Sequence, residues 1–231
     1  MIIDSDSLEI KKFTCSLVDS NSFLIVEGNK GLLIDATDSD ELYKAIEPLS
    51  ELTIILTHCH FDHIVGLNRI RDLKPQTKVV ATSLCSEYIG NSYKNMSSVA
   101  NIFLMFYNKQ EIEEDLIKPT TCKPAEIVFN DKQIFDWNGH NINLLAVHGH
   151  SKDSLIAILD EKYLFSGDTL LSIPTVTRFP NGSTRKFWEE DIPLLKSLNQ
   201  NLIVYPGHGE VGSISDMILV NKLPKKPTGK K

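Results

Sequence analysis

Short apolar runs bounded by turn residues recur along the whole chain and predict a core built around β-strands. The run over residues 52–56, Leu-Thr-Ile-Ile-Leu, is nearly continuous, which is typical of a strand buried on both faces. We predict strands over residues 13–18, 23–26, 32–35, 52–56, 78–81, 127–129, 133–135, 142–147, 155–159, 163–165 and 202–205.

Helices are predicted between these strands. Ser39 can cap a helix that ends before Pro48. We predict helices over residues 40–47, 64–73 and 186–198, and mostly helical structure over 83–117.

The chain shows no linker, low-complexity stretch or repeat that would divide it. We therefore expect a single domain over residues 1–231, with sheets inside and helices outside and a core over about 13–212. Residues 86–117 would form a helical insertion. The basic tail over 221–231 would be a solvated or disordered end.

Composition narrows the classes of function. A net charge of −6 over 231 residues argues against nucleic-acid binding, which depends on basic contacts to phosphates. No apolar stretch approaches the length of a membrane span, and no targeting signal precedes the first strand. The four cysteines form no CxxC pair. We expect a cytoplasmic protein with reduced thiols that acts on a small molecule.

The segment Thr57–His63, Thr-His-Cys-His-Phe-Asp-His, follows a predicted buried strand and holds several candidate metal ligands. Imidazole and carboxylate groups bind zinc and neighbouring metals well. A loop just beyond a strand end can turn several such groups toward one point. The spacing predicts a metal site with the candidate ligands His58, His60, Asp62 and His63.

Three later segments offer further ligands. His150, Asp168 and His208 each follow a predicted strand and each lie next to glycine. Glycine permits the backbone to approach a site closely. Each residue is weak evidence by itself, but together they add three ligand groups at strand ends.

In these motifs the chain resembles the metallo-β-lactamase superfamily, in its hydrolase branch. The pattern His-x-His-x-Asp-His is present at residues 58–63, and His150, Asp168 and His208 correspond to the later histidine, the bridging aspartate and the last histidine. The resemblance extends over residues 13–212. It implies an α/β fold, the αββα four-layer sandwich with two mixed sheets flanked by helices.

The resemblance also implies how the ligands are divided. His58, His60 and His150 would bind a first metal, Asp62, His63 and His208 a second, and Asp168 would bridge both. We expect two Zn²⁺ ions, with iron or manganese as alternatives, and a shared water activated to hydroxide that attacks a carbonyl. Asp62 would also be catalytic, accepting a hydrogen bond from that hydroxide.

Other polar residues near the motifs have simpler interpretations. We expect His148 to be no ligand, His140 to lie exposed in a turn, and the Cys59 side chain to point away into packing. The chain has Val65 where the family often has glycine, and Lys152-Asp153 where it often has Pro-Gly. Neither departure removes a ligand, but both leave the loop shape and the substrate open.

Within the superfamily the chain is most similar to glyoxalase II-like thioester hydrolases. The segment Arg178–Ser183 is similar to a loop of that branch, which makes Arg178 a candidate substrate contact. A full glyoxalase II carries a helical glutathione-binding domain, for which the short stretch after His208 leaves no room. We therefore expect a thioester of the acyl-CoA or carrier-protein type. A lactonase or other esterase, a persulfide dioxygenase-like enzyme with one iron, and a signalling protein that retains the site are the alternatives.

The insertion over residues 86–117 has more apolar side chains than one helical stripe needs. One interpretation is core packing or the interface of a homodimer. The other is that part of it roofs the site, with Phe103 and Phe106 as candidate contacts to an apolar acyl or aryl group.

Overall fold

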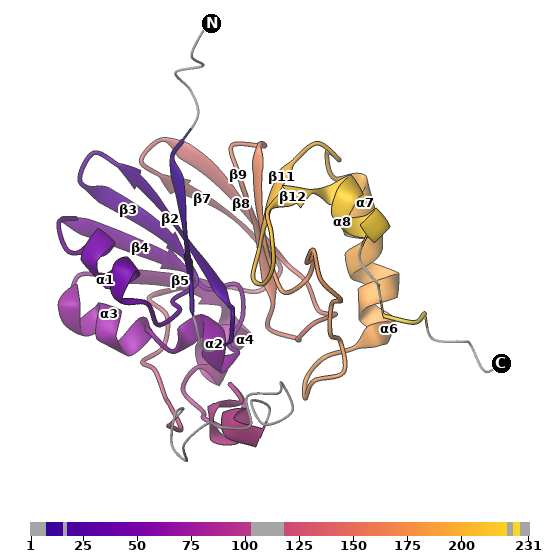
Figure 1. The fold of residues 1–231 in the computed structure, drawn as a ribbon, viewed down its shortest axis with the longest axis horizontal. Coiled ribbons are helices and arrows are strands. Elements are labelled where there is room, and N and C mark those ends of the chain that lie inside the picture. Colours follow the sequence, from indigo (N-terminus) through magenta and orange to yellow (C-terminus); the bar gives the residue numbers. More distant parts are fainter. Residues whose placement is uncertain (1–7, 16–17, 103–117, 221–223, 227–231) are drawn as a thin grey trace, which may run out of the picture.

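The computed structural model describes residues 8–15, 18–102, 118–220 and 224–226. Two six-stranded mixed sheets form its centre (Figure 1). The first contains, in spatial order, β1 (Ile10–Thr14), β2 (Asn21–Glu27), β3 (Lys30–Ile34), β4 (Glu51–Ile55), β5 (Lys78–Thr82) and β6 (Ile127–Phe129). The second contains β12 (Gly212–Ser213), β11 (Ile203–Pro206), β10 (Tyr163–Gly167), β9 (Leu155–Leu159), β8 (His140–Ala146) and β7 (Lys132–Trp137).

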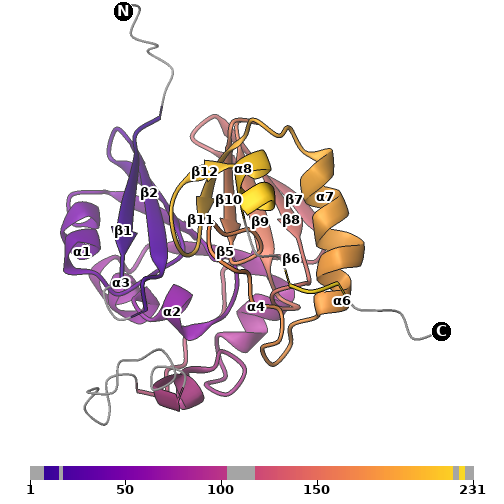
Figure 2. The same cartoon turned by 45° about the vertical axis from the view of Figure 1, so that its right-hand side comes forward.

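Helices cover the outer face of each sheet (Figures 1 and 2). The helices on the first sheet's side are α1 (Asp40–Ile46), α2 (Phe61–Ile64), α3 (Leu67–Leu73) and α4 (Ser83–Tyr88), followed by the short η1 (Ser97–Val99). Those on the second sheet's side are α6 (Thr184–Lys186), the π-helical turn η2 (Phe187–Asp191), α7 (Ile192–Ser197) and α8 (Ile214–Val220). The arrangement is the four-layer αββα sandwich that the family resemblance implied.

Three apolar clusters hold the layers together. In β2, Phe23 and Ile25 face the space between the two sheets, whereas Leu24 faces the helices. In β9, Leu155 packs between the sheets and Ile156 packs toward α7 and α8. Because successive side chains of a strand point to opposite faces, a strand that is covered on both sides must be apolar throughout. This explains the continuous apolar runs of the sequence.

The strands bring the candidate ligands to one edge of the sandwich. β3 and β4 are parallel, so Asp35 and the segment after Ile55 leave the first sheet at the same edge. β10 and β11 are also parallel and end at this edge of the second sheet. The Leu155 amide donates to the Thr57 carbonyl at 2.7 Å, which joins the two sheets there.

Several element boundaries differ from the prediction. β1 begins and ends earlier than the predicted strand over residues 13–18. It ends at Thr14 because the next residue, Cys15, enters a turn in which its amide donates to the Ser20 carbonyl. The predicted helix over 64–73 is interrupted at Gly66, whose amide donates to the Ala36 carbonyl. β12 and α8 were not predicted.

The described part of the segment 83–117 is also less helical than predicted. Between α4 and η1 the chain turns, and the Asn91 side chain accepts hydrogen bonds from the amides of Tyr93 and Lys94. Such local bonds compete with a helix. The candidate substrate contacts Phe103 and Phe106 lie outside the described residues. Within the described helices, none is long and apolar enough to cross a membrane.

Candidate metal centre

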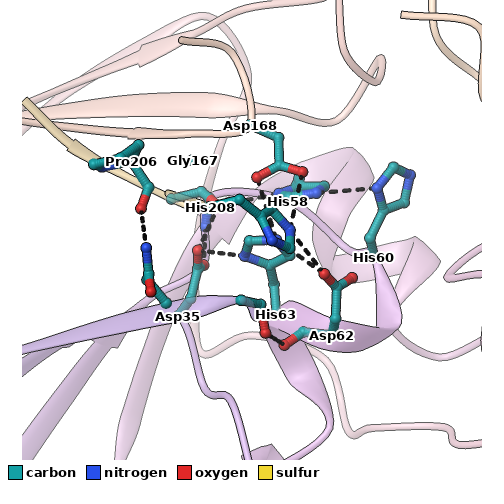
Figure 3. A network of polar contacts seen from close by, with 12 residues as sticks. Asp35, His58, His60, Asp62, His63, Gly167, Asp168, Pro206 and His208 are labelled. Carbon is teal, nitrogen blue, oxygen red and sulfur yellow. Dashed lines mark hydrogen bonds and ion pairs between the residues drawn. The ribbon is translucent and has the colours of Figure 1, made fainter. Parts of the chain in front are cut away.

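The loop after β4 and the first turn of α2 carry four of the seven predicted ligands (Figure 3). His58 and His60 lie in the loop, while Asp62 and His63 lie in α2. The other three follow strands of the second sheet. Six of the seven side chains are buried, and that of His208 is 17% exposed. The structure thus brings together all seven residues from four segments of the chain, which follow strands of both sheets.

Three histidines form a first cluster. His58 Nε2 and His150 Nε2 each lie 3.0 Å from His60 Nδ1. The remote Nδ1 of His150 donates to the Val176 carbonyl at 2.7 Å. The remote Nδ1 of His58 lies 3.0 Å from Thr57 Oγ1. Because the remote nitrogens carry the protons, the facing nitrogens present lone pairs to a common point.

A second cluster lies beside the first. Asp62 Oδ2 is 3.1 Å from His208 Nε2 and 3.5 Å from His63 Nε2. The Nδ1 of His63 is 2.8 Å from Asp35 Oδ2, so its Nε2 faces the cluster. The Nδ1 of His208 donates to the Asp19 carbonyl at 3.2 Å.

Asp168 lies close to a member of each cluster. Its Oδ1 is 3.4 Å from His63 Nε2, and its Oδ2 is 3.5 Å from His150 Nε2. The residue after β11 approaches so closely that a Cβ atom at Gly207 would lie 2.2 Å from Asp168 Oδ1. This position therefore requires glycine, and the predicted role of glycine beside the ligands has a steric basis here.

Two buried polar atoms indicate that cations belong in this centre. His63 Nε2 and Asp168 Oδ1 have no hydrogen-bond partner within the described residues, although buried polar atoms are normally satisfied. The ligand atoms within each of three overlapping groups lie within 4.8 Å of one another. Imidazole nitrogens and carboxylate oxygens are the donor types that bind zinc or iron. The residues present fit divalent metal ions.

Electrostatics keep the first cluster in the form that binds metals. Burial, together with the neighbouring histidines, holds the pKa of His58 well below its usual value. Burial lowers the pKa of His60 to about 4, and it also lowers the pKa of His150. These imidazoles are therefore neutral near pH 7, with their lone pairs available.

The second cluster is charged. Burial alone would raise the pKa of Asp62, but His63 and His208 outweigh it and lower the pKa to about 2. In the same way, histidines hold the pKa of Asp168 well below its usual value. Burial acts against protonated His208, yet Asp168 and Asp62 raise its pKa to about 8. The pKa of His63 is also raised well above its usual value, by the nearby carboxylates against the effect of burial.

Asp35 supports the centre and was missed at the sequence level. Its Oδ1 accepts from the Thr57 amide and its Oδ2 from Thr57 Oγ1, both at 2.7 Å, in addition to its contact with His63. Asp35 directly follows the apolar run 32–34, and Asp168 follows the run 163–165 after Ser166 and Gly167. The same strand-end rule could therefore have singled it out.

Cys59 lies between two ligands but outside the ligand groups found among the described residues. Its amide donates to Asp153 Oδ2 at 2.7 Å, and its buried thiol lies 3.6 Å from the Lys94 carbonyl oxygen. Burial and the nearby Asp153 hold the pKa of this thiol well above its usual value. Asp153 thus fixes the loop between His58 and His60.

The remaining histidines lie elsewhere. The Nδ1 of His148 donates to the Lys152 carbonyl at 3.0 Å. His140 is the first residue of β8 rather than a turn residue, and it is half-buried against Trp137 with its Nδ1 2.6 Å from Asp160. The expectation that it would lie exposed in a turn is therefore wrong, because the strand begins two residues earlier than predicted.

One side of the first cluster is apolar. The Phe179 ring centroid is 5.5 Å from that of His60 and 5.8 Å from that of His150. Phe179 packs with Phe61 and Met96 in a small separate cluster. Arg178, the predicted substrate contact, is exposed next to Phe179. Phe179 was not predicted as a site residue from the sequence.

The chain is similar in sequence to known proteins and to one family model. The sequence model of the metallo-beta-lactamase superfamily matches residues 16–208. A probable metallo-hydrolase of Streptococcus pyogenes is 24% identical over 87% of this chain and 84% of its own. A hydroxyacylglutathione hydrolase of Tolumonas auensis is 24% identical over 82% of this chain and 61% of its own.

Solved structures share the fold. The B3 metallo-beta-lactamase BLEG-1 superposes with a TM-score of 0.72 at 23% identity, covering 90% of this chain and 95% of its own. TTHA1623 in a di-iron-bound form has a TM-score of 0.69 at 22% identity, covering 92% of this chain and 98% of its own. Because the family model spans most of the chain and includes every ligand position, the chain belongs to the metallo-beta-lactamase superfamily.

Proposed function

We propose that the chain is a di-metal hydrolase that cleaves thioesters of the acyl-CoA or carrier-protein type. The observation that carries the proposal is the pair of ligand clusters that share Asp168. Three histidines would hold one ion, two histidines and Asp62 would hold the other, and Asp168 would contribute to both. We propose zinc because mixed imidazole and carboxylate sites suit it.

Two divalent ions would supply a nucleophile near neutral pH and polarise the carbonyl that is attacked. The chain's own residues prepare that step. Asp62 stays ionised because its pKa is about 2, so it can accept a hydrogen bond from the attacking water and orient it. Thr57 and Asp35 hold the rings of His58 and His63 from behind. A preorganised centre of this kind needs little rearrangement during reaction.

The protonation states favour a thioester over an amide. While the seven groups act as ligands, they are deprotonated and hold no proton for a leaving group. A thiol has a pKa of about 8.5 and leaves readily as the thiolate, whereas an amine must be protonated before it leaves. One relative, the hydroxyacylglutathione hydrolase, is named for a glutathione substrate, which supports a thioester as the substrate class.

The apolar side of the centre indicates where the acyl group binds. Phe179 lies beside two ligands of the first cluster and is only partly buried. We propose that the acyl or aryl part of the substrate contacts Phe179, and that exposed Arg178 faces the anionic carrier. Each apolar methylene that is buried would contribute roughly 0.8 kcal/mol to binding.

The four cysteines are free and buried, which supports a reducing compartment such as the cytoplasm.

A substrate panel tests this proposal. The zinc-loaded protein and a separate iron-loaded sample are assayed with acyl-CoA thioesters of increasing chain length, acyl-homoserine lactones, an aryl ester and a persulfide with oxygen consumption recorded. We expect thioester hydrolysis that depends on the metal, and a chain-length preference that Phe179→Ala flattens. Exclusive lactone hydrolysis, or oxygen uptake with one iron per chain, would overturn the thioester proposal. Absence of turnover in every arm with both metals bound would favour a signalling or binding role.

A further inference from the structure

Asp191 is a buried carboxylate that belongs to neither ligand cluster. It is the last residue of the π-helical turn η2, which continues α6 and leads directly into α7. Asp191 is only 1% exposed to solvent. An ionisable group in this position requires partners, since burying a charge without them is costly.

The partners of Asp191 are backbone amides of the loop that carries His150. Asp191 Oδ1 accepts from the His148 amide at 3.1 Å, and Oδ2 accepts from the Gly149 amide at 2.8 Å. These are the two amides that immediately precede the ligand. Both carboxylate oxygens therefore act on the short segment between β8 and His150.

Close packing reinforces these hydrogen bonds. A side chain at Gly149 would lie 2.3 Å from Asp191 Oδ2 and 2.6 Å from Phe187 Cβ. Only glycine lets the loop approach the helix this closely. The same glycine accepts a hydrogen bond from the Ser183 amide at 2.8 Å. The loop before His150 is thus held against both ends of the segment from Ser183 to Asp191.

The π-helical geometry itself calls for an explanation. Such turns are rare, and they occur frequently at functional sites. Burial raises the pKa of Asp191 to about 6, although both amide hydrogen bonds act to lower it. At neutral pH Asp191 is therefore a buried anion, although a neutral side chain at this position would avoid the cost of burying a charge. A buried carboxylate that stays ionised despite this cost is a candidate for a functional role.

We propose that Asp191 is a positioning residue for the first metal: it holds the loop of His148 and Gly149 so that His150 Nε2 faces His58 and His60. The proposal rests on the di-metal centre of the proposed function, but it does not depend on which bond is cleaved. Hydrogen-bonding partners behind metal ligands typically change metal affinity by about 10–100-fold.

The test compares Asp191→Asn and Asp191→Ala with Glu190→Gln. Glu190 is the matched control, because it is an exposed carboxylate one residue away that pairs with Lys186 rather than with the loop. Zinc affinity is measured by competition with a chromophoric chelator, and folding of the metal-free proteins is followed by circular dichroism on heating. Activity is recorded against free zinc concentration.

We expect one of the two zinc ions to bind about 10-fold more weakly in Asp191→Asn, which keeps one acceptor, and up to about 100-fold more weakly in Asp191→Ala. Metal-free Asp191→Asn should melt no lower than the wild type, Glu190→Gln should bind zinc normally, and added zinc should restore activity. Folded variants with two wild-type zinc affinities would overturn the proposal, as would a stability loss in Asp191→Asn without a change in zinc affinity. If the affinity shifts as expected while no thioester is cleaved, Asp191 retains its role and only the proposed substrate fails.

Discussion

Lowering the pH should remove the second metal long before the first. A metal ion competes with protons for its ligands. The affinity for the metal is therefore highest above the pKa that a ligand has in the metal-free fold, and it declines as the pH falls below that pKa. His208 has a raised pKa of about 8, and the pKa of His63 is raised in the same direction. In the first cluster the pKa of His60 is lowered to about 4.

The size of the effect follows from these values. A ligand with a pKa of about 8 is half protonated at pH 8 and almost fully protonated at pH 6. The affinity of the second ion should therefore fall on the order of 50-fold over this range from His208 alone. Protonation of His63 would increase the loss. Over the same range His60 stays neutral, so the first ion should be bound with nearly constant affinity.

The assay measures bound zinc per chain after gel filtration at a fixed free zinc concentration between pH 8 and pH 6. We expect a decline from two ions toward one. Two variants assign the ions: His60→Ala should lose its remaining ion at pH 6, whereas His208→Ala should keep it. Parallel loss of both ions, or retention by His60→Ala and loss by His208→Ala, would refute the electrostatic account.

Three further predictions concern single side chains. Asp62→Asn should lower turnover by about 100-fold or more. His140→Ala removes a contact to Asp160 far from the ligands and should change turnover little. Equal losses of turnover in steady-state assays of the two variants would contradict the assignment of the catalytic site. Cys59→Ala should keep two zinc ions by elemental analysis, because the thiol lies outside the ligand groups. Asp191 has a pKa raised to about 6, so its contribution to stability is present at low pH and is lost as the pH rises through 6. Between about pH 4 and pH 6, metal-free Asp191→Asn should therefore gain about 2 kcal/mol in denaturant unfolding relative to wild type, and a flat difference would contradict the burial argument.

The sequence could predict the layers of the fold because burial on both faces leaves a direct pattern. Residues 52–56 are apolar almost throughout, and β4 is covered by helices on one side and by the second sheet on the other. Ends of elements were harder to predict. The break at Gly66 depends on its hydrogen bond to Ala36, a contact between distant segments that no local pattern reveals.

The ligands could be predicted because motif spacing and strand ends carry them, but the supporting residues Asp153 and Asp191 could not. Asp153 and Asp191 act through hydrogen bonds to backbone amides of distant loops, 94 and 42 residues away in sequence. Nothing in the local sequence around either aspartate identifies its partner. Phe179 is similar, since its contact with His60 and His150 exists only after both sheets meet.

The central claim is that seven ligand groups bind two metal ions that carry out hydrolysis. The most direct measurement is elemental analysis of protein purified without chelator, paired with hydrolytic activity on the same sample before and after metal removal. The account predicts close to two ions per chain, loss of hydrolysis on removal, and recovery as the second equivalent of metal is restored. Full hydrolytic activity with one ion or none would contradict it.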